Sequence, residues 1–363
     1  MADMSTSDAA RNIAAGHLVA FPTETVYGLG ADACNDEAVA KIFTAKGRPA
    51  DHPLIVHVQA ASQVSRFAAD VPDFAQRLID AFWPGPLTVI LPRLPGVATA
   101  CAGGQDSIGL RCPSHPVALE LLAACAKLGV HGMAAPSANK FGKVSPTTQA
   151  HVMAELGSAI PVLDGGACDV GIESTIVDCT RGAPVLLRPG TLTRVAIEAA
   201  LGCNLLSNDE QSEQVMKGLV AKNASKITPE DALTASAPRA VLATSAPRAV
   251  LAKSAPRASG TLASHYAPRA TLRLMDAKAL QTALDLLGRE GKNIAIYARS
   301  PLQLFSNQIL LRRMPDDALA TAQQLFAVLR ELDADDVRLI WVETVPPEPD
   351  WDGVRDRLQR AAA

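Results

Sequence analysis

The chain alternates short apolar runs with amphipathic stretches as far as about residue 202. The short runs predict strands, whereas apolar positions that recur every three or four residues predict helices. The uneven spacing of the two favours a mixed α/β sheet over a regular series of parallel strand–helix–strand units. The predicted strands are residues 18–21, 54–58, 87–91, 108–111, 133–135, 161–163, 175–177 and 185–187; the predicted helices are 35–45, 72–82, 116–128, 146–156 and 193–201.

Residues that favour helix N-termini precede several of these helices. Asn35 and either Ser114 or His115 carry side chains that can accept a hydrogen bond from a free backbone N–H. Ser145 stands before Pro146, and proline suits the first turn of a helix because its missing N–H would be unpaired there anyway. We therefore expect Ser145 to cap the helix that begins at Pro146.

Residues 204–264 differ in composition from the segments on either side. They are polar and small, and the sequence Ser-Ala-Pro-Arg-Ala-Val-Leu-Ala recurs with a period of nine residues, beginning at Ser236 and Ser245 and shortened at Ser254. Prolines this frequent prevent a regular helix or central strand, so we interpret the segment as an extended linker. A solenoid is the alternative, although solenoid repeats usually span about 20 residues or more.

The α/β pattern resumes after residue 270. It predicts strands at 293–297 and 337–342 and helices at 277–289, 316–332 and 351–362, which suggest a small doubly wound α/β domain. This domain contains no glycine-rich phosphate loop, so its sequence leaves its function open. The expected organisation is an N-terminal α/β domain at residues 5–202, a linker at 203–269 and the small C-terminal domain at 270–363.

Composition argues against several classes of protein. The net charge is −3 and aromatic residues make up 4% of the chain, which disfavours a stacking surface for nucleic acid. The seven cysteines include no C-x-x-C pair, so we expect free thiols in a reducing cytoplasm rather than a zinc ribbon. No uncharged apolar run approaches about 18 residues, and the N-terminus does not resemble a signal peptide. We expect a cytoplasmic protein without a membrane span.

The motif Lys46-Gly47-Arg48-Pro49 places two cations where a predicted helix gives way to a strand. Gly47 permits the turn and Pro49 prevents the helix from continuing. Two cations on a fixed turn can neutralise a polyphosphate. The alternative is a solvated helix C-terminus, where lysine and arginine are favoured by the helix dipole.

Two further loops carry groups that suit phosphate. After the strand predicted at 133–135, Ser137 and Asn139 offer a hydroxyl, an amide and free backbone N–H groups. Turn formation and capping are the alternative for these residues. The motif Gly28-Leu29-Gly30 resembles a dinucleotide fingerprint, but residues 22–25 separate it from the preceding strand, so we interpret it as part of a polar loop. There is no Walker phosphate loop.

Single polar residues interrupt or end apolar runs. His57 lies within a predicted strand, where packing is the commoner role, and Arg111 and Arg188 end strands. A buried arginine needs an anionic partner, either an internal carboxylate or a ligand. Two such arginines together with the Lys46–Arg48 motif favour an anionic ligand.

Taken in order, these motifs resemble those of YrdC-type L-threonylcarbamoyl-AMP synthases. The resemblance covers about residues 5–202, and the His265-Tyr266-Ala267-Pro268 motif with the C-terminal segment is similar to the long, two-domain form of this enzyme. Each motif is short, but their shared order is specific. They are residues 22–29, 46–49, 53–54, 83–88, 111–113, 137–139, 173–178 and 188–190.

The resemblance implies a twisted α/β domain with a deep, positively charged cavity and a set of site residues. His52 departs from the pattern, because the family usually has asparagine there; its ring can still donate to a phosphate or ribose oxygen. Lys46 and Arg48 would be catalytic. L-Threonine would contact Thr25, His57, Arg111, the backbone of Ala135, and Ser174; ATP would contact Arg48, His52, Ser107, Ser137, Asn139, Ser145, Arg188 and Tyr266.

The activity that the resemblance implies joins L-threonine, bicarbonate and ATP into L-threonylcarbamoyl-AMP and pyrophosphate. N-carboxythreonine would attack the α-phosphate without a protein nucleophile. Mg²⁺ would be bound by the phosphates rather than by protein side chains, and no organic cofactor is expected. The product would pass to the machinery that modifies adenosine beside the anticodon of tRNA; direct tRNA binding stays open.

Two alternatives share the same motifs. One is the carbamoyl-adenylate chemistry of hydrogenase-maturation proteins, but their acylphosphatase and zinc-finger modules have no counterpart in this sequence. The other is an RNA- or ribosome-binding module that uses a basic cavity without catalysis. The acidic balance and the few aromatic residues argue against the second alternative.

Overall fold

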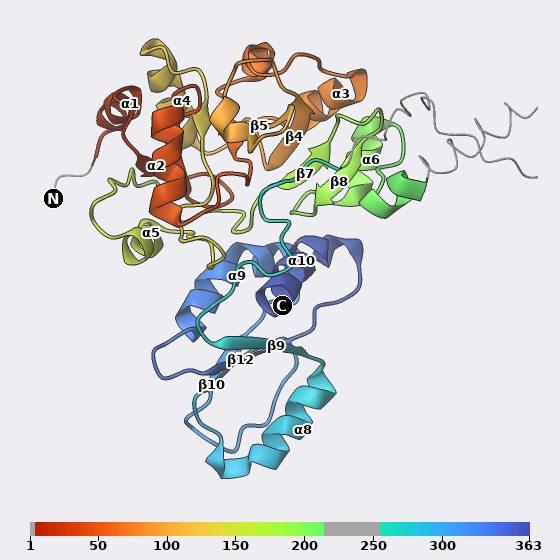
Figure 1. Cartoon of the computed structure of the whole chain (residues 1–363). Helices are drawn as coiled ribbons and strands as arrows, with labels where there is room; N and C mark the ends of the chain where they lie inside the picture. Colours follow the sequence, from red (N-terminus) through yellow and green to blue (C-terminus); the bar gives the residue numbers. More distant parts are fainter. Residues whose placement is uncertain (1–3, 214–254) are drawn as a thin grey trace, which may run out of the picture.

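The computed structural model describes residues 4–213 and 255–363, which form two α/β domains (Figure 1). The larger N-terminal domain lies above the smaller C-terminal domain in this view, and residues from 255 onward return between them. The repeats that begin at Ser236 and Ser245 lie outside the described residues. In the part of the chain that the structure describes, no helix is long and apolar enough to cross a membrane.

An eight-stranded mixed sheet organises the N-terminal domain, as the sequence predicts. The strand order is β1-β2-β6-β3-β5-β4-β7-β8; β3 pairs with β5 and β4 with β7 in parallel, and the other neighbours are antiparallel. The strands are β1 (Val19–Phe21), β2 (Gly28–Asp32), β3 (Ile55–His57), β4 (Leu87–Pro92), β5 (Ser107–Arg111), β6 (Met133–Ala134), β7 (Thr175–Asp178) and β8 (Val185–Arg188).

The helices of this domain begin where capping residues accept backbone hydrogen bonds. Asn35 Oδ1 accepts from the N–H of Ala38 and His115 Nδ1 from that of Val117, which confirms both predicted caps. The helices are α1 (Thr6–Ala14), α2 (Asp36–Lys46), α3 (Asp73–Phe82), α4 (Pro116–Lys127), α5 (Gln149–Leu156) and α6 (Arg194–Leu201), with 3-10 turns at Ala61–Arg66 and Thr99–Ala102.

Three sequence predictions in this domain are wrong. Helix α5 starts later than predicted, and Thr148 caps it instead of Ser145. Residues 161–163 form only an isolated bridge, in which Val162 pairs with Ala20. The glycine motif assigned to a loop forms strand β2: a Cβ on Gly30 would lie 2.7 Å from Met133 Cε, so the glycine allows close packing within the sheet.

The C-terminal domain is a four-stranded parallel sheet of order β11-β10-β12-β9, which confirms the predicted doubly wound arrangement. Helix α8 packs on one face, while α9 and α10 pack on the other. The elements are β9 (Thr271–Met275), α8 (Ala277–Leu287), β10 (Ile294–Ala298), β11 (Leu310–Arg313), α9 (Ala318–Leu332), β12 (Leu339–Glu343) and α10 (Asp352–Ala361), with 3-10 turns at Gly288–Glu290 and Pro349–Trp351.

Helices α9 and α10 also form the contact with the N-terminal domain (Figure 1). Two glycines permit backbone to approach backbone at this interface. A Cβ on Gly171 would lie 2.2 Å from the carbonyl oxygen of Gln323 in α9, and one on Gly353 of α10 would lie 2.5 Å from that of Gly190. The C-terminal domain therefore docks directly on the segments that precede β7 and follow β8 of the larger domain.

Candidate functional site

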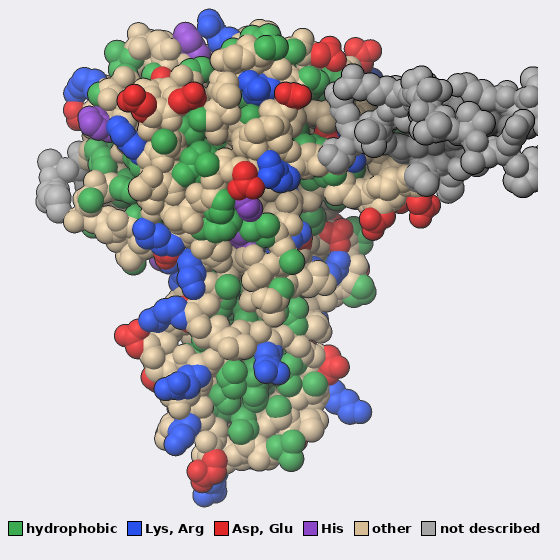
Figure 2. All heavy atoms as spheres, viewed as in Figure 1, with side chains coloured by type: hydrophobic (Ala, Val, Ile, Leu, Met, Phe, Trp, Pro, Cys, Tyr) green, Lys and Arg blue, Asp and Glu red, His purple; other side chains and the backbone are tan. Residues whose placement is uncertain are grey.

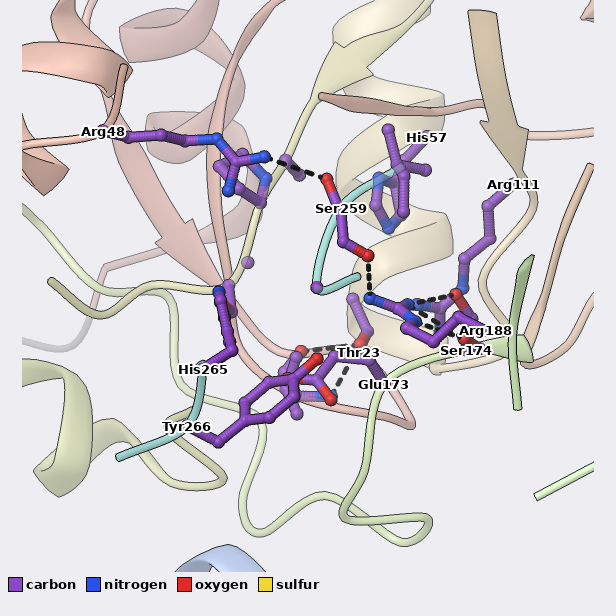
Figure 3. Close-up of a pocket in the computed structure, with 17 residues that line it drawn as sticks. Thr23, Arg48, His57, Arg111, Glu173, Ser174, Arg188, Ser259, His265 and Tyr266 are labelled. Carbon is purple, nitrogen blue, oxygen red and sulfur yellow. Dashed lines mark hydrogen bonds between the residues drawn. The ribbon is translucent and has the colours of Figure 1, made fainter. Parts of the chain in front are cut away.

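A cavity lies where the loops of the N-terminal domain meet the returning segment 259–266 (Figure 3). Its walls come from β2, β3, β5 and β8, from the loops at 23–26, 135–137 and 173–174, and from the turn after α2. Three arginines line it, together with two histidines and one glutamate. The polar lining residues are Thr23, Arg48, His57, Arg111, Ser137, Glu173, Ser174, Arg188, Ser259, His265 and Tyr266.

Lys46 holds the loop that forms one wall of the cavity, although it does not line the cavity itself. It ends helix α2 and is 3% exposed, and its ammonium donates to the carbonyl oxygens of Ser137 and Asn139. Burial and the nearby Arg48 lower the pKa of Lys46 well below its ordinary value. The contacts of Lys46 fix the loop that presents the Ser137 side chain.

Arg48 reaches the cavity from the other side of the Gly47 turn. Gly47 adopts a left-handed conformation, with φ of +64°, which redirects the chain after the helix. The guanidinium donates to the Pro53 carbonyl at 2.9 Å and to Ser259 Oγ at 3.2 Å. Burial lowers the pKa of Arg48 to about 10, so the side chain keeps its charge at neutral pH.

Arg188 holds the opposite wall and shares a partner with Arg48. Its Nε and Nη2 donate to the Ser174 carbonyl at 3.1 and 2.9 Å, and Nη1 donates to the Ser259 carbonyl at 2.7 Å. Burial lowers the pKa of Arg188 from its ordinary value. Two buried guanidinium groups thus converge on Ser259 (Figure 3).

The returning segment fits closely over the cavity. Gly260 has φ of +71°, and a Cβ there would lie 2.3 Å from the Tyr266 hydroxyl and 2.7 Å from Arg188 Nη1. Tyr266 is fully buried, and its hydroxyl has no hydrogen-bond partner among the described residues. Burial and the neighbouring Glu173 raise the pKa of Tyr266 to about 12. The tyrosine therefore presents a neutral hydroxyl to the cavity.

The last copy of the sequence repeat holds this segment down. Arg257 forms an ion pair with Asp51 at 2.9 Å and donates to the Gly103 carbonyl at 2.6 Å, and its backbone N–H donates to Gln105 Oε1. We interpret the repeats as a linker, but the copy that contains Arg257 packs against the N-terminal domain. Arg257 belongs to the closure of the cavity.

A second group of polar residues lines the same cavity. Arg111 Nη2 donates to Glu24 Oε1 at 2.6 Å. Arg111 Nε and His57 Nδ1 have no hydrogen-bond partners among the described residues. Thr23 lines the cavity, whereas Thr25 lies behind it, 2.9 Å from Thr23 between hydroxyl oxygens. Both arginine and histidine can therefore accommodate an anionic or carbonyl group.

Glu173 lines the cavity and bonds to one residue of each domain. Its Oε1 accepts from Ser145 Oγ at 2.5 Å, and its Oε2 accepts from Arg357 Nε of α10 at 2.8 Å. Burial alone would raise the pKa of Glu173, but Arg357 and Arg188 hold it below its ordinary value. The predicted capping residue Ser145 is thus fully buried against this carboxylate.

The structure brings most of the predicted site residues together. Ala135, Ser137, Ser174, Arg188 and Tyr266 line the main cavity with Arg48, His57 and Arg111. Ser107 lines a second, adjoining cavity that shares Ile55 and Ser259 with the first. The remaining five line neither cavity: Lys46 donates to the Ser137 and Asn139 carbonyls, Thr25 bonds to Thr23, His52 packs against Phe141, Asn139 donates to the Lys140 and Lys143 carbonyls, and Ser145 donates to Glu173.

Sequence reasoning missed four polar lining residues: Thr23, Glu173, Ser259 and His265. Thr23 and Glu173 lie within motifs that the sequence had singled out, next to residues chosen instead. Ser259 follows the last repeat and carried no signal, because its role depends on the two arginines that meet it only in the folded chain.

Burial of His57 makes a testable contribution to stability at acid pH. Burial and Arg111 lower the pKa of His57 from 6.5 to about 3, so the folded state favours the neutral ring. The free energy of unfolding therefore has its full contribution from His57 above pH 6.5, the pKa of histidine in the unfolded chain. This contribution is lost as the pH falls from 6.5 towards 3. At pH 5 the loss is about 2 kcal/mol.

Urea unfolding of His57→Gln between pH 7 and 5 should show a shallower pH dependence than the wild type. An equal slope for wild type and His57→Gln would contradict the assignment of a buried, neutral His57.

Two protein-family models match this chain, one for each part of its two-domain organisation. A family model described as Telomere recombination matches residues 11–190, and one described as Threonylcarbamoyl-AMP synthase, C-terminal domain, matches residues 210–363. Threonylcarbamoyl-AMP synthase of Pyrococcus abyssi is 34% identical over 361 residues, which cover 98% of this chain and 93% of that protein. The chain belongs to the threonylcarbamoyl-AMP synthase family.

Other members of the threonylcarbamoyl-AMP synthase family extend this result. The Bacillus subtilis protein is 43% identical over 245 residues, covering 66% of this chain and 67% of that protein. The Schizosaccharomyces pombe protein is 34% identical over 382 residues, covering 95% and 85%. These matches confirm the resemblance to the long, two-domain form of the family.

Two solved structures of the P. abyssi family member, named Sua5, share the fold. The structure described as a complex with L-threonine has a TM-score of 0.78 and 33% identity, covering 98% of this chain and 94% of that one. A variant with consecutive histidine and tyrosine residues replaced by alanine has a TM-score of 0.79 and 32% identity, covering 98% and 92%. Both coverages include the two domains.

Proposed function

We propose that the cavity joins L-threonine, bicarbonate and ATP into L-threonylcarbamoyl-AMP and pyrophosphate. The observation that carries this proposal is the presence of three buried arginines in the lining of one cavity. Arg48 and Arg188 both bond to Ser259, and Arg111 and His57 line the same cavity (Figure 3). A substrate pair with a polyphosphate and an amino-acid carboxylate supplies anionic partners for such a set of cations.

Arg111 and His57 are placed to receive the amino acid. Glu24 fixes the Arg111 side chain through Nη2, so its unpartnered Nε and the ring of His57 remain for the threonine carboxylate. Thr23 or Ser174 supplies a hydroxyl for the side chain of threonine. A site that hydrogen-bonds this hydroxyl should discriminate strongly against valine, because valine leaves the buried partner unpaired.

Arg48, Arg188 and Ser137 are placed to receive the nucleotide. In the reaction, the amine of threonine and bicarbonate form a carbamate with loss of water. A carbamate oxygen then attacks the α-phosphate while pyrophosphate leaves with the electrons of the broken P–O bond. Guanidinium groups held by backbone carbonyls stabilise the charge that develops on the phosphates without needing to reorganise. The protein contributes positioning and electrostatic stabilisation rather than a nucleophile.

Mg²⁺ belongs to this proposal as part of the substrate, bound to ATP oxygens. Among residues 4–213 and 255–363, no group of three or more histidine, cysteine or acidic side chains could hold a metal ion. Glu173, the carboxylate that lines the cavity, is already paired with Ser145 and Arg357. The downstream acceptor of the adenylate would be the enzyme system that modifies tRNA.

The segment 257–266 would act as a cover that shields the adenylate from water. Ser259 bonds to both phosphate-side arginines, so it occupies the positions that phosphate oxygens would take. ATP binding would then displace Ser259 while Tyr266 stays in the wall.

A substrate-omission assay tests the function directly. Pyrophosphate release by the full chain should require L-threonine, bicarbonate and MgATP together, and omission of any one should reduce it to background. L-Valine in place of L-threonine should support little release. Release that is independent of threonine would reject the proposal.

Nucleic-acid binding by these cations is poorly supported. Arg48, Arg111 and Arg188 are 7%, 4% and 2% exposed, so a duplex or folded RNA cannot reach them. The face drawn in Figure 2 mixes basic and acidic side chains over both domains. The RNA- or ribosome-binding alternative therefore gains no support from the placement of the arginines.

A further inference from the structure

Arg357 of helix α10 is the largest fully buried side chain among the described residues, although it belongs to the C-terminal domain. Its donors all point into the larger domain or along its own helix. Nε donates to Glu173 Oε2 at 2.8 Å, and Nη2 donates to the Glu173 carbonyl at 3.0 Å. Nη1 donates to the Pro189 carbonyl and to Asp356 Oδ2, each at 2.8 Å. One guanidinium therefore binds both the loop that precedes β7 and the loop that follows β8.

The same guanidinium supports the tyrosine of the returning segment. Its carbon lies 5.4 Å from the centre of the Tyr266 ring, and Phe326 of α9 lies 5.4 Å from that ring, centroid to centroid. Tyr266 has φ of +63°, a conformation that is strained for a non-glycine residue and needs surrounding contacts to hold it. Both contacts to the ring named here come from helices of the C-terminal domain.

The contacts of Arg357 lead to the phosphate side of the cavity. Ser174 follows Glu173 directly, and the Ser174 carbonyl accepts two hydrogen bonds from Arg188. Pro189 follows Arg188 on the other loop. Fixing the carbonyls at 173 and 189 therefore fixes the direction in which Arg188 points. The close approach of Gly353 to Gly190 brings α10 near enough for these contacts.

We propose that Arg357 is a positioning residue for the adenylation reaction, through which the C-terminal domain completes the ATP side of the cavity. It acts through Glu173 and Tyr266 and does not touch the substrates. This inference rests on the proposed function. It assigns to the C-terminal domain a part in catalysis that its own sequence does not indicate.

The competing explanation is that Arg357 only joins the domains. Arg330 of α9 offers the control, because it is a partly buried arginine between the same two domains. It pairs with Glu155 at 3.2 Å and donates to the Val144 and Ser145 carbonyls. None of these three partners lines the cavity. Loss of Arg330 should weaken docking without altering the direction of Arg188.

The test uses the full chain and compares steady-state kinetics of Arg357→Ala, Arg357→Lys, Glu173→Gln and Arg330→Ala. We expect Arg357→Ala to lower kcat/KM for ATP by about 30-fold or more, with KM for L-threonine changed by less than about twofold. Arg357→Lys should restore part of the loss, because it keeps the charge near Glu173. Arg330→Ala should stay within about threefold of wild type in both constants.

The energetic coupling between Arg357 and Glu173, measured with a double variant, gives a second readout. The combined Arg357→Ala and Glu173→Gln variant should lose less activity than the product of the two single losses, because both remove the same link. Additive losses would overturn the proposal, as would equal kinetic effects of Arg357→Ala and Arg330→Ala. If Arg357→Ala does not fold, Arg357→Lys and Glu173→Gln carry the same comparison. A wild-type chain without threonine-dependent turnover would instead reject the proposed function.

Discussion

Arg48→Ala is expected to lower kcat/KM for ATP by about 100- to 1000-fold, which is the range found when one preorganised donor to a transition-state charge is removed. Arg48 is 7% exposed and lies opposite Arg188, with Ser259 between them. Removal of its charge leaves the developing negative charge on the phosphates with one guanidinium instead of two. Pyrophosphate release at saturating L-threonine and bicarbonate measures the effect.

Two further variants separate charge from geometry and from stability. Arg48→Lys should recover part of the activity, because an ammonium keeps the charge but not the planar set of donors. Arg93→Ala is the matched control: this arginine also donates to backbone carbonyls, those of Leu94, Val97 and Gln105, but it lies outside both cavities. Wild-type turnover by a folded Arg48→Ala variant would remove the arginine from the site.

The sequence predicts those parts of the site that local patterns determine. The Lys46–Arg48 motif follows an amphipathic helix and contains a glycine, so a turn that directs Arg48 away from the helix could be expected. Arg111 and Arg188 end apolar strands, and such positions lie at sheet edges where ligands bind. The motif resemblance then indicated which of these polar residues belong together.

Other features depend on packing between segments distant in sequence. Gly28 and Gly30 resemble loop glycines, but their lack of side chains permits close contact with Phe21, Ala135 and Met133 in the sheet. Ser145 before a proline resembles a helix cap, yet Glu173 reaches its hydroxyl from 28 residues away. No local pattern can reveal either partner.

The roles of the linker and of the C-terminal domain could not be predicted for the same reason. Arg257 is one of several similar Ala-Pro-Arg-Ala arginines, and its ion pair with Asp51, 206 residues away in the sequence, forms only in the folded chain. Arg357 lies in an unremarkable amphipathic helix, and its importance depends on contacts 168 and 184 residues away in the sequence. Residues that complete a site from a second domain carry no motif of their own.

Gly260→Ala is expected to lower turnover by about tenfold or more while leaving both domains folded. The new Cβ would lie 2.3 Å from the Tyr266 hydroxyl and 2.7 Å from Arg188 Nη1, so the returning segment could not seat over the cavity without displacing one of them. An alanine at φ of +71° also costs about 1 to 2 kcal/mol of backbone strain. The clash adds to that strain and acts directly on two groups of the site.

Gly96→Ala separates the clash from the strain. Gly96 has φ of +77°, close to that of Gly260, but a Cβ there would meet no atom within 4 Å. It should lose similar backbone stability and keep wild-type kcat/KM. The position of the segment can be followed independently by limited trypsin digestion, because Arg257 is held by Asp51 and Gly103 when the segment is seated. Cleavage after Arg257, identified by mass, should be faster in Gly260→Ala than in Gly96→Ala, and equal rates together with equal turnover would show that the cavity does not need this cover.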